Sequence, residues 1–222
     1  MLLADRVLFI DAEAMVIDKP AGLPVDRPRD GALSVENHLD SLRFGFERRP
    51  QTVHRLDRDT SGCLLLARNP RVHKRFSMAF EKGEVEKTYL AVLDGIPREA
   101  DGVVDLPLNK ISTAQDGWRI VVEKRGKPAV TRWEIAGFAG GRALVRLMPT
   151  TGRTHQLRVH AASGIGLPIV GDPVYGPSSG SGGGTHMMLH AATIRVPRDN
   201  HPAIVATAPL PPHFIEAGFS DG

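Results

Sequence analysis

HRLDRDTSG, residues 54–62, is a charged turn set between two apolar segments. Val53 precedes it and the run CLLLA at residues 63–67 follows it, a pattern that predicts buried strands on both sides. Within the turn, Asp57 lies among two arginines and a histidine. Nearby guanidinium groups favour the ionised form of an acid, so Asp57 is expected to be a carboxylate available as a nucleophile. The alternative, a purely structural ion pair, is favoured if these nine residues are considered alone.

The composition is that of an ordinary globular protein. The chain has 222 residues, of which 41% are hydrophobic, and we expect a single domain over residues 1–222. The formal net charge is only +3, so a nucleic-acid surface would have to come from local clustering. Basic residues outnumber acids between Arg43 and Lys87, which indicates either a solvated face or such a surface.

Cysteine content and hydropathy indicate the cellular compartment of the protein. Cys63 is the one cysteine of the sequence, so no internal disulfide is possible and a reducing compartment is expected. No apolar segment approaches the roughly 20 residues that cross a bilayer. The N-terminal segment MLLADRVLFIDAEAM is interrupted by charged residues and does not resemble a signal peptide. We therefore expect a cytoplasmic protein without membrane contact.

Periodicity predicts many short strands and few helices. The clearest helix follows Asn69, a typical N-cap, has Pro70 in its first turn and ends at Gly83. The uneven order of the elements predicts an α+β fold, a mixed and largely antiparallel β-sheet with flanking helices. Strands are expected at 7–10, 15–18, 87–93, 118–123, 129–135, 143–148, 165–170, 188–196 and 203–208, and further helices at 34–42, at 154–162 and after Pro211.

A low-complexity segment, SSGSGGG, occupies residues 178–184. It has no side chains to pack and great backbone freedom, so it predicts a flexible surface loop. Such a loop is either a dispensable connector or a flap that orders when substrate binds.

Three polar clusters fall at strand ends or turns, where sites are usually built. The first is residues 54–62. The second contains Lys87 and Tyr89, which the strand period places on one side of the sheet. The third is TGRTHQLRVH at residues 151–160, a dense run of hydrogen-bond donors. Its Arg153 needs a carboxylate from another element, and Asp57 is the natural candidate.

Spacing argues against several other chemistries. The sequence contains neither H-E-x-x-H nor C-x-x-C, and His155 and His160 are five residues apart, so we expect no metal site. No glycine loop leads into Lys-Ser or Lys-Thr, so no nucleotide cofactor is expected. A glycosidase needs two carboxylates, and Asp59 is the one nearby second acid.

HRLDRDTSG resembles the signature of the RluA family of pseudouridine synthases. The resemblance implies the mixed β-sheet catalytic domain of that family and conversion of uridine in RNA to pseudouridine, without cofactor or metal. Larger members carry a ribosomal-protein-like module before the catalytic pattern, which starts here at Val7, so we expect a stand-alone catalytic domain. Further agreement, in family order, comes from DKPAGLPV at 18–25, KTYLAVL at 87–93, GKPAVT at 126–131, GRTHQLRVH at 152–160, GDPVYG at 171–176 and LHA at 189–191.

The resemblance also implies roles for four residues. Asp57 is the catalytic aspartate, which attacks either C1′ of the ribose or C6 of the base. Tyr89 packs on the target base and serves in proton abstraction from C5. Arg153 pairs with Asp57, and Arg55 fills the gap left when the uridine leaves the stack.

The expected partner is RNA, either ribosomal RNA or a transfer RNA stem-loop, bound by a monomer. Two alternatives stay open: a non-catalytic RNA-binding or RNA-folding protein on the same scaffold, and a phosphodiesterase that uses His54 and His155 as acid and base. Besides Arg55, the residues expected to bind RNA are His54, Arg58, Thr60, Lys19, Lys87, His155, Gln156 and Arg158, with Lys19, Arg58, Lys87 and Arg158 as phosphate contacts.

Overall fold

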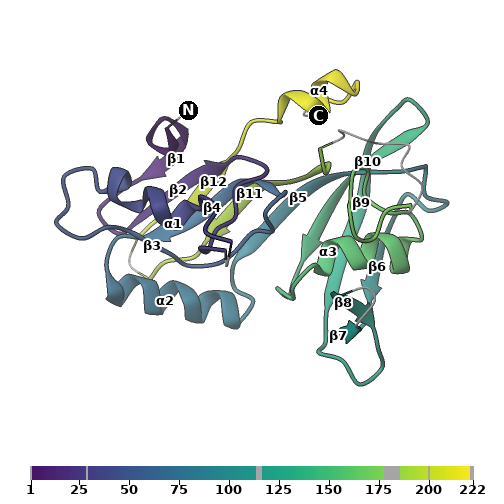
Figure 1. The fold of residues 1–222 in the computed structure, drawn as a ribbon, viewed down its shortest axis with the longest axis horizontal. Coiled ribbons are helices and arrows are strands. Elements are labelled where there is room, and N and C mark those ends of the chain that lie inside the picture. The colour runs from purple at the N-terminus through teal and green to yellow at the C-terminus, as the bar shows by residue number, and fades with distance from the viewer. Residues whose placement is uncertain (1, 29, 114–116, 178–185, 200, 221–222) are drawn as a thin grey trace. The chain divides into compact units, whose positions relative to one another are not determined.

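The computed structural model describes residues 2–28, 30–113, 117–177, 186–199 and 201–220. The chain divides into two compact units (Figure 1). The first unit comprises residues 1–87 and 190–209, and the second comprises residues 88–189 and 210–222. The predicted loop at 178–184 lies outside the described residues.

The first unit is built on a mixed sheet. Its central strand β4 pairs antiparallel with β2 and β3 and parallel with β11. The outer strands β1 and β12 are antiparallel to β2 and β11 respectively. The bounds are β1 Val7–Ile10, β2 Ala14–Lys19, β3 Gln51–Thr52, β4 Ser61–Ala67, β11 Leu189–Val196 and β12 Ile204–Thr207.

Helix α2 (Pro70–Glu81) packs on this sheet because one of its faces is apolar (Figure 1). The side chain of Asn69 accepts a 2.9 Å hydrogen bond from the Val72 N–H and so caps the helix. After the helix ends, Gly83 adopts a φ of 72°, which favours glycine. Phe76 is fully buried in the core between α2 and the strands. The predicted helix, cap and terminator are confirmed.

The predicted helix at 34–42 is divided into two turns. α1 (Val35–His38) is followed by a 3₁₀ turn at Leu39–Leu42, and a second 3₁₀ turn lies at Leu3–Arg6. Asn37 fixes the start of α1, since its side-chain oxygen accepts hydrogen bonds from the N–H and hydroxyl of Ser34. The predicted position of the helix is therefore correct. The prediction of one continuous α-helix is wrong, because a 3₁₀ turn follows the first turn.

The second unit contains an antiparallel sheet in the order β5-β10-β9-β6 and a separate β7–β8 hairpin. A short α3 continues into a π-helical turn, His160–Ile165, and these pack Leu157 and Ala161 against Leu147 of the sheet. The bounds are β5 Glu86–Leu93, β6 Asp101–Asp105, β7 Leu108–Thr113, β8 Gly117–Val122, β9 Val130–Ala139, β10 Arg142–Pro149, α3 Gln156–Val159 and α4 Pro212–Glu216.

The fold class predicted from sequence is confirmed: a mixed, largely antiparallel β-sheet with few helices. The strand predicted at 165–170 is wrong. Ile165 ends the π-helical turn, Gly166 has a φ of 86°, and Ile169 makes an isolated bridge with Leu93. A left-handed residue followed by Pro168 leaves too little extended chain for a strand. Strands β6 and β7 were not predicted.

Candidate active site and RNA-binding surface

Asp57 lies on a tight turn directly before β4. Its main-chain carbonyl accepts a 3.2 Å hydrogen bond from the Thr60 N–H, and Leu56 beside it is buried. The carboxylate-bearing residue itself is half-buried. Thr60 is 2% exposed, so its prediction as an RNA contact is wrong; it belongs to the interior of the turn.

Gly62 allows β4 to approach its parallel neighbour. A Cβ atom at this position would lie 2.2 Å from the carbonyl oxygen of Ala191, and the φ of Gly62 is +103°. Because both the backbone conformation and the space exclude a side chain, glycine is required one residue into the strand that follows the Asp57 turn.

Lys19 is fully buried beneath this turn. Its ammonium group donates hydrogen bonds to the carbonyl oxygens of Pro20 and Leu23, both at 2.8 Å, and of Arg58 at 3.0 Å. The prediction of Lys19 as a phosphate contact is therefore wrong, because the ammonium group cannot reach solvent. It joins the segment after β2 to the Asp57 turn.

The buried ammonium group is also an electrostatic partner of the acids in the turn. Burial lowers the pKa of Lys19 to about 7, while the negative charges of Asp59 and Asp57 act to raise it. Lys19 thus supplies a positive charge from below the turn whenever it is protonated.

His54 has a structural role. Its Nε2 accepts a 3.0 Å hydrogen bond from the Leu65 N–H, and its ring stacks on Phe80 with centroids 4.6 Å apart. Burial, and then the positive charge of Lys87, lower the pKa of His54 to about 3. Because its Nε2 already accepts a hydrogen bond, the ring is fixed by the protein itself, and the roles predicted for His54 as an RNA contact and as a general acid stay predictions.

Arg55 and Arg58 are exposed on the same turn. Arg55 forms a 2.7 Å ion pair with Asp26, and 69% of its side chain is exposed. Arg58 donates from Nε to the Gly22 carbonyl at 3.2 Å. Both guanidinium groups face solvent, and their predicted contacts with RNA stay predictions.

Strand β5 carries Lys87 and Tyr89, both half-buried. The ammonium group of Lys87 is 5.8 Å from the ring centroid of Phe80, and burial lowers the pKa of Lys87. Tyr89 pairs with Leu147 of β10. The roles predicted for the two side chains stay predictions.

Gln156 organises the segment that contains Arg153. Its side-chain oxygen accepts hydrogen bonds from the Thr151 hydroxyl (2.8 Å) and the Arg153 N–H (3.0 Å). Its side-chain nitrogen donates to the Val130 carbonyl and the Thr131 hydroxyl, both at 3.0 Å. Gln156 is 4% exposed, and both the oxygen and the nitrogen of its side-chain amide are hydrogen-bonded within the protein. Its prediction as an RNA contact is therefore wrong.

Arg153 is exposed, and its Nε donates to the Pro128 carbonyl at 3.0 Å. This bond leaves the two terminal nitrogens of the guanidinium group for other partners. Arg153 belongs to the second unit and Asp57 to the first, and their ion pair stays a prediction.

His155 adopts a left-handed conformation, with a φ of 52°. Its Nδ1 lies 3.0 Å from the hydroxyl oxygen of Tyr175, which also accepts a 3.0 Å hydrogen bond from the Ile120 N–H of β8. On another side, the His155 ring packs on Trp118, with centroids 5.1 Å apart. The segment of Arg153 is thereby attached to the β7–β8 hairpin.

Arg158 forms a buried bidentate ion pair with Asp172, with two N–O distances of 2.7 Å. The exposed fractions of the two side chains are 6% and 0%. Its prediction as a phosphate contact is wrong, because the guanidinium group faces the interior. The ion pair gives a structural role to one residue in each of two sequence blocks, because it joins GRTHQLRVH to GDPVYG.

Among the described residues, no three His, Cys, Asp or Glu side chains gather as metal ligands would. Within the same residues, none of the helices has the length and apolar character to cross a membrane.

The model of the RNA pseudouridylate synthase family matches residues 13–163, more than half of the chain. The chain belongs to this family. An uncharacterized RNA pseudouridine synthase of Zymomonas mobilis is 61% identical over 218 residues, which cover 98% of this chain and 99% of that protein. The dual-specificity RNA pseudouridine synthase RluA of Escherichia coli K12 is 35% identical and covers 89% of this chain and 87% of its own length.

The structure of human RNA pseudouridylate synthase domain containing 4 superposes with a TM-score of 0.81, at 28% identity, over 97% of this chain and 92% of that one. The protein is thus an RNA pseudouridine synthase of the RluA family, an isomerase.

In this synthase the structure brings Asp57, Arg58 and Lys19 together in the first unit and Arg153 and His155 in the second. Sequence reasoning missed Trp118 and Tyr175 as members of the second group. Tyr175 had a signal, since it lies in the block GDPVYG. Trp118 is a large aromatic residue beside a polar turn, which is also a recognisable signal.

Proposed function

We propose that this synthase flips specific uridines out of structured RNA, ribosomal or transfer RNA or both, and isomerises them with Asp57 as nucleophile. The observation that carries the proposal is the rigid mounting of Asp57. The turn is closed by a hydrogen bond to its own carbonyl and held from below by Lys19 through the Arg58 carbonyl. A nucleophile fixed before the substrate arrives has little conformational freedom left to lose on reaction.

The chemistry begins when Asp57 attacks either C1′ of the ribose or C6 of the base. By either route the N1–C1′ bond breaks, a C5–C1′ bond forms, C5 loses its proton and N1 ends protonated, so the nucleotide keeps its composition. We assign Tyr89 to packing on the base and to proton removal from C5. In this proposal Arg153 pairs with Asp57 and places a positive charge beside the nucleophile.

Arg55 is suited to replace the flipped base. Flipping a base out of a stack costs a few kcal/mol, roughly, and a planar guanidinium group that enters the gap offsets part of this cost. The ion pair of Arg55 with Asp26 is exposed, and exposed ion pairs contribute only about 0–1 kcal/mol to stability. RNA can therefore displace Asp26 from Arg55 at little cost. Arg58, Lys87 and His155 are further RNA contacts in this proposal.

Replacement of Asp57 by Asn tests the nucleophile. Asp57→Asn should form no pseudouridine in bulk transfer or ribosomal RNA, while RNA affinity stays within about threefold, because the change leaves the basic surface intact. Pseudouridine would be mapped along the RNA and affinity measured by filter binding. Asp59→Asn, two residues away in the same turn, is the matched control and should remain active. Pseudouridine formation by Asp57→Asn would remove Asp57 from this role.

We also place this reaction in the cytoplasm. The thiol of Cys63 is buried, and burial raises its pKa to about 12. A thiol with so little thiolate is a packing group rather than a redox group, and the one cysteine of the sequence cannot form an internal disulfide, which suits a reducing compartment.

A further inference from the structure

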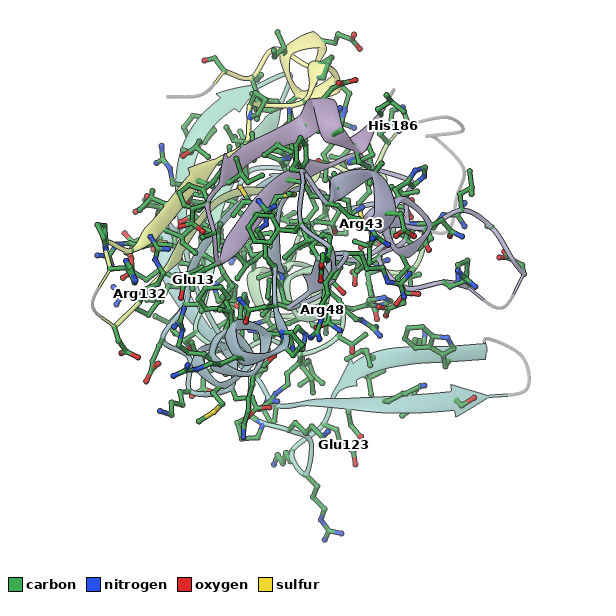
Figure 2. All side chains as sticks on the ribbon, turned by 90° about the vertical axis from the view of Figure 1, so that its left-hand side faces the viewer. Glu13, Arg43, Arg48, Glu123, Arg132 and His186 are labelled. Carbon is green, nitrogen blue, oxygen red and sulfur yellow. The ribbon has the colours of Figure 1, made fainter. Side chains whose placement is uncertain are left out.

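Trp118 is an exposed aromatic side chain on the β7–β8 hairpin. It is 48% exposed, whereas the second tryptophan of the chain, Trp133, is 7% exposed. Figure 2 shows side chains projecting from both faces of this hairpin, with Glu123 at its base. Removing an indole ring from water lowers the free energy, so a ring left exposed is a candidate contact for a binding partner. The residues around it indicate what kind of partner it could bind.

One face of the hairpin passes from the core to solvent. Near the base, Leu108 and Ile120 are buried against Val159. Register places Lys110 opposite Ile120 and Ser112 opposite Trp118, so Trp118 continues this same face beyond the core. The ring is therefore presented on the side of the hairpin that faces α3.

The ring is also held in place. His155 packs on it at 5.1 Å, and the hydroxyl of Tyr175 bonds both His155 and the Ile120 N–H. The ammonium group of Lys110 lies 4.9 Å from the ring centroid. Because Lys110 is exposed and flexible, a planar group can displace it from the ring without disturbing the contact with His155.

The location of the ring connects it to the predicted catalytic residues of the same unit. His155 is two residues from Arg153, a separation of at most about 7 Å along the chain. Successive stacked bases are about 3.4 Å apart, so the separation of His155 from Arg153 corresponds to about two nucleotides, and the 5.1 Å between the His155 and Trp118 rings adds about one or two more. The hairpin and the turn after it are also basic, with Lys110, Arg119, Lys124, Arg125 and Lys127.

We propose that Trp118 stacks on an unpaired base of the RNA substrate, a few nucleotides from the flipped uridine, while Lys110 moves to a neighbouring phosphate. The inference rests on the proposed function for its RNA substrate. An aromatic platform that stacks one base has little sequence preference, because every base offers a π face. Trp118 therefore contributes affinity and fixes the position of the flanking strand.

Fluorescence tests the contact directly. In Trp133→Phe, Trp118 is the sole tryptophan, and bulk transfer RNA should quench its emission on binding. Heparin, a polyanion without bases, should bind the basic surface with little quenching. Unchanged emission at saturating RNA, or equal quenching by heparin, overturns the inference.

Kinetics tests its contribution. Trp118→Ala should lose roughly tenfold in kcat/KM, mainly through a higher KM, as expected for loss of one base–aromatic stack. Trp118→Phe, which keeps a ring, should recover most of the loss, and Phe138→Ala, which removes another exposed aromatic side chain of the same unit, should have no effect. Unchanged kcat/KM in Trp118→Ala contradicts the inference. Activity that survives in Asp57→Asn would instead refute the proposed nucleophile and leave the Trp118 quenching as it is.

Discussion

The buried ammonium group of Lys19 should make the stability of this protein depend on pH between about 7 and 9. Its pKa falls from 10.5 in the unfolded chain to about 7 in the folded protein, because burial disfavours the charged form. Between these values the unfolded chain binds one proton that the folded protein does not. The free energy of unfolding must therefore rise with pH from about 7 upward.

The magnitude follows from the two pKa values. One proton of difference corresponds to about 1.4 kcal/mol per pH unit, and Lys19 is half-titrated at the start of the window, so the rise from pH 7 to 9 is about 2 kcal/mol. Above this window the Cys63 thiol acts in the opposite direction, because its pKa is raised from 9.0 to about 12. Measurements should therefore stop near pH 9.

Urea unfolding of the wild type and of Lys19→Met at several pH values between 6 and 9 measures this effect. The variant leaves three carbonyls without their donor, at roughly 1–3 kcal/mol each, which lowers its stability at every pH. The slope of the unfolding free energy against pH is independent of this constant loss. In Lys19→Met the slope should be smaller by the contribution of Lys19. Lys87, whose pKa is also lowered by burial, contributes equally to both proteins. Parallel stability curves for the two proteins would refute the reasoning.

Two further substitutions test the packing beside the site. Gly62→Ala should lower the free energy of unfolding by roughly 2 kcal/mol or more, because it combines backbone strain with a clash against the Ala191 carbonyl. Gly45→Ala, at a φ of +83° with open space around it, carries the strain alone and should cost less in the same urea titration. Arg158→Ala should cost about 3–5 kcal/mol, because it leaves the buried carboxylate of Asp172 without its partner. A thermal unfolding midpoint within 2 °C or so of the wild type would contradict this estimate.

Sequence was sufficient for the elements whose signals are local. Helix α2 has a capping side chain, a proline in its first turn and a left-handed glycine after it, and each acts through the nearest few residues. Strand β7 lacked such a signal. Its sequence LNKIST has one apolar residue on each face and so shows no clear alternation, and it is a strand because β8 pairs with it. The missing strand at 165–170 has the opposite cause, since an apolar run was broken by Gly166 and Pro168.

The buried polar residues near the expected site show what sequence could not predict. Lys19, Gln156 and Arg158 lie in blocks that resemble those of a catalytic family, and each is a polar side chain whose partners are other parts of the protein. Sequence shows that a lysine is present and does not show whether a carbonyl or a phosphate will accept its hydrogen bond. Arg55, Arg58 and Arg153 are exposed and their ion-pair and hydrogen-bond partners do not enclose them, so the roles predicted for them stay predictions.

The first unit is discontinuous along the chain, and this has a consequence for synthesis on the ribosome. Residues 1–87 are made first, but the partners that complete their core, Ile194, Val196 and Ile204, come from residues 190–209. At 5–20 residues per second, the intervening hundred or so residues take about 5–20 s to make. During that interval one edge of β4 is unpaired and part of the apolar surface of α2 is uncovered, because β11 and β12 have not been made. The nascent chain therefore needs protection from premature association until β11 and β12 have emerged.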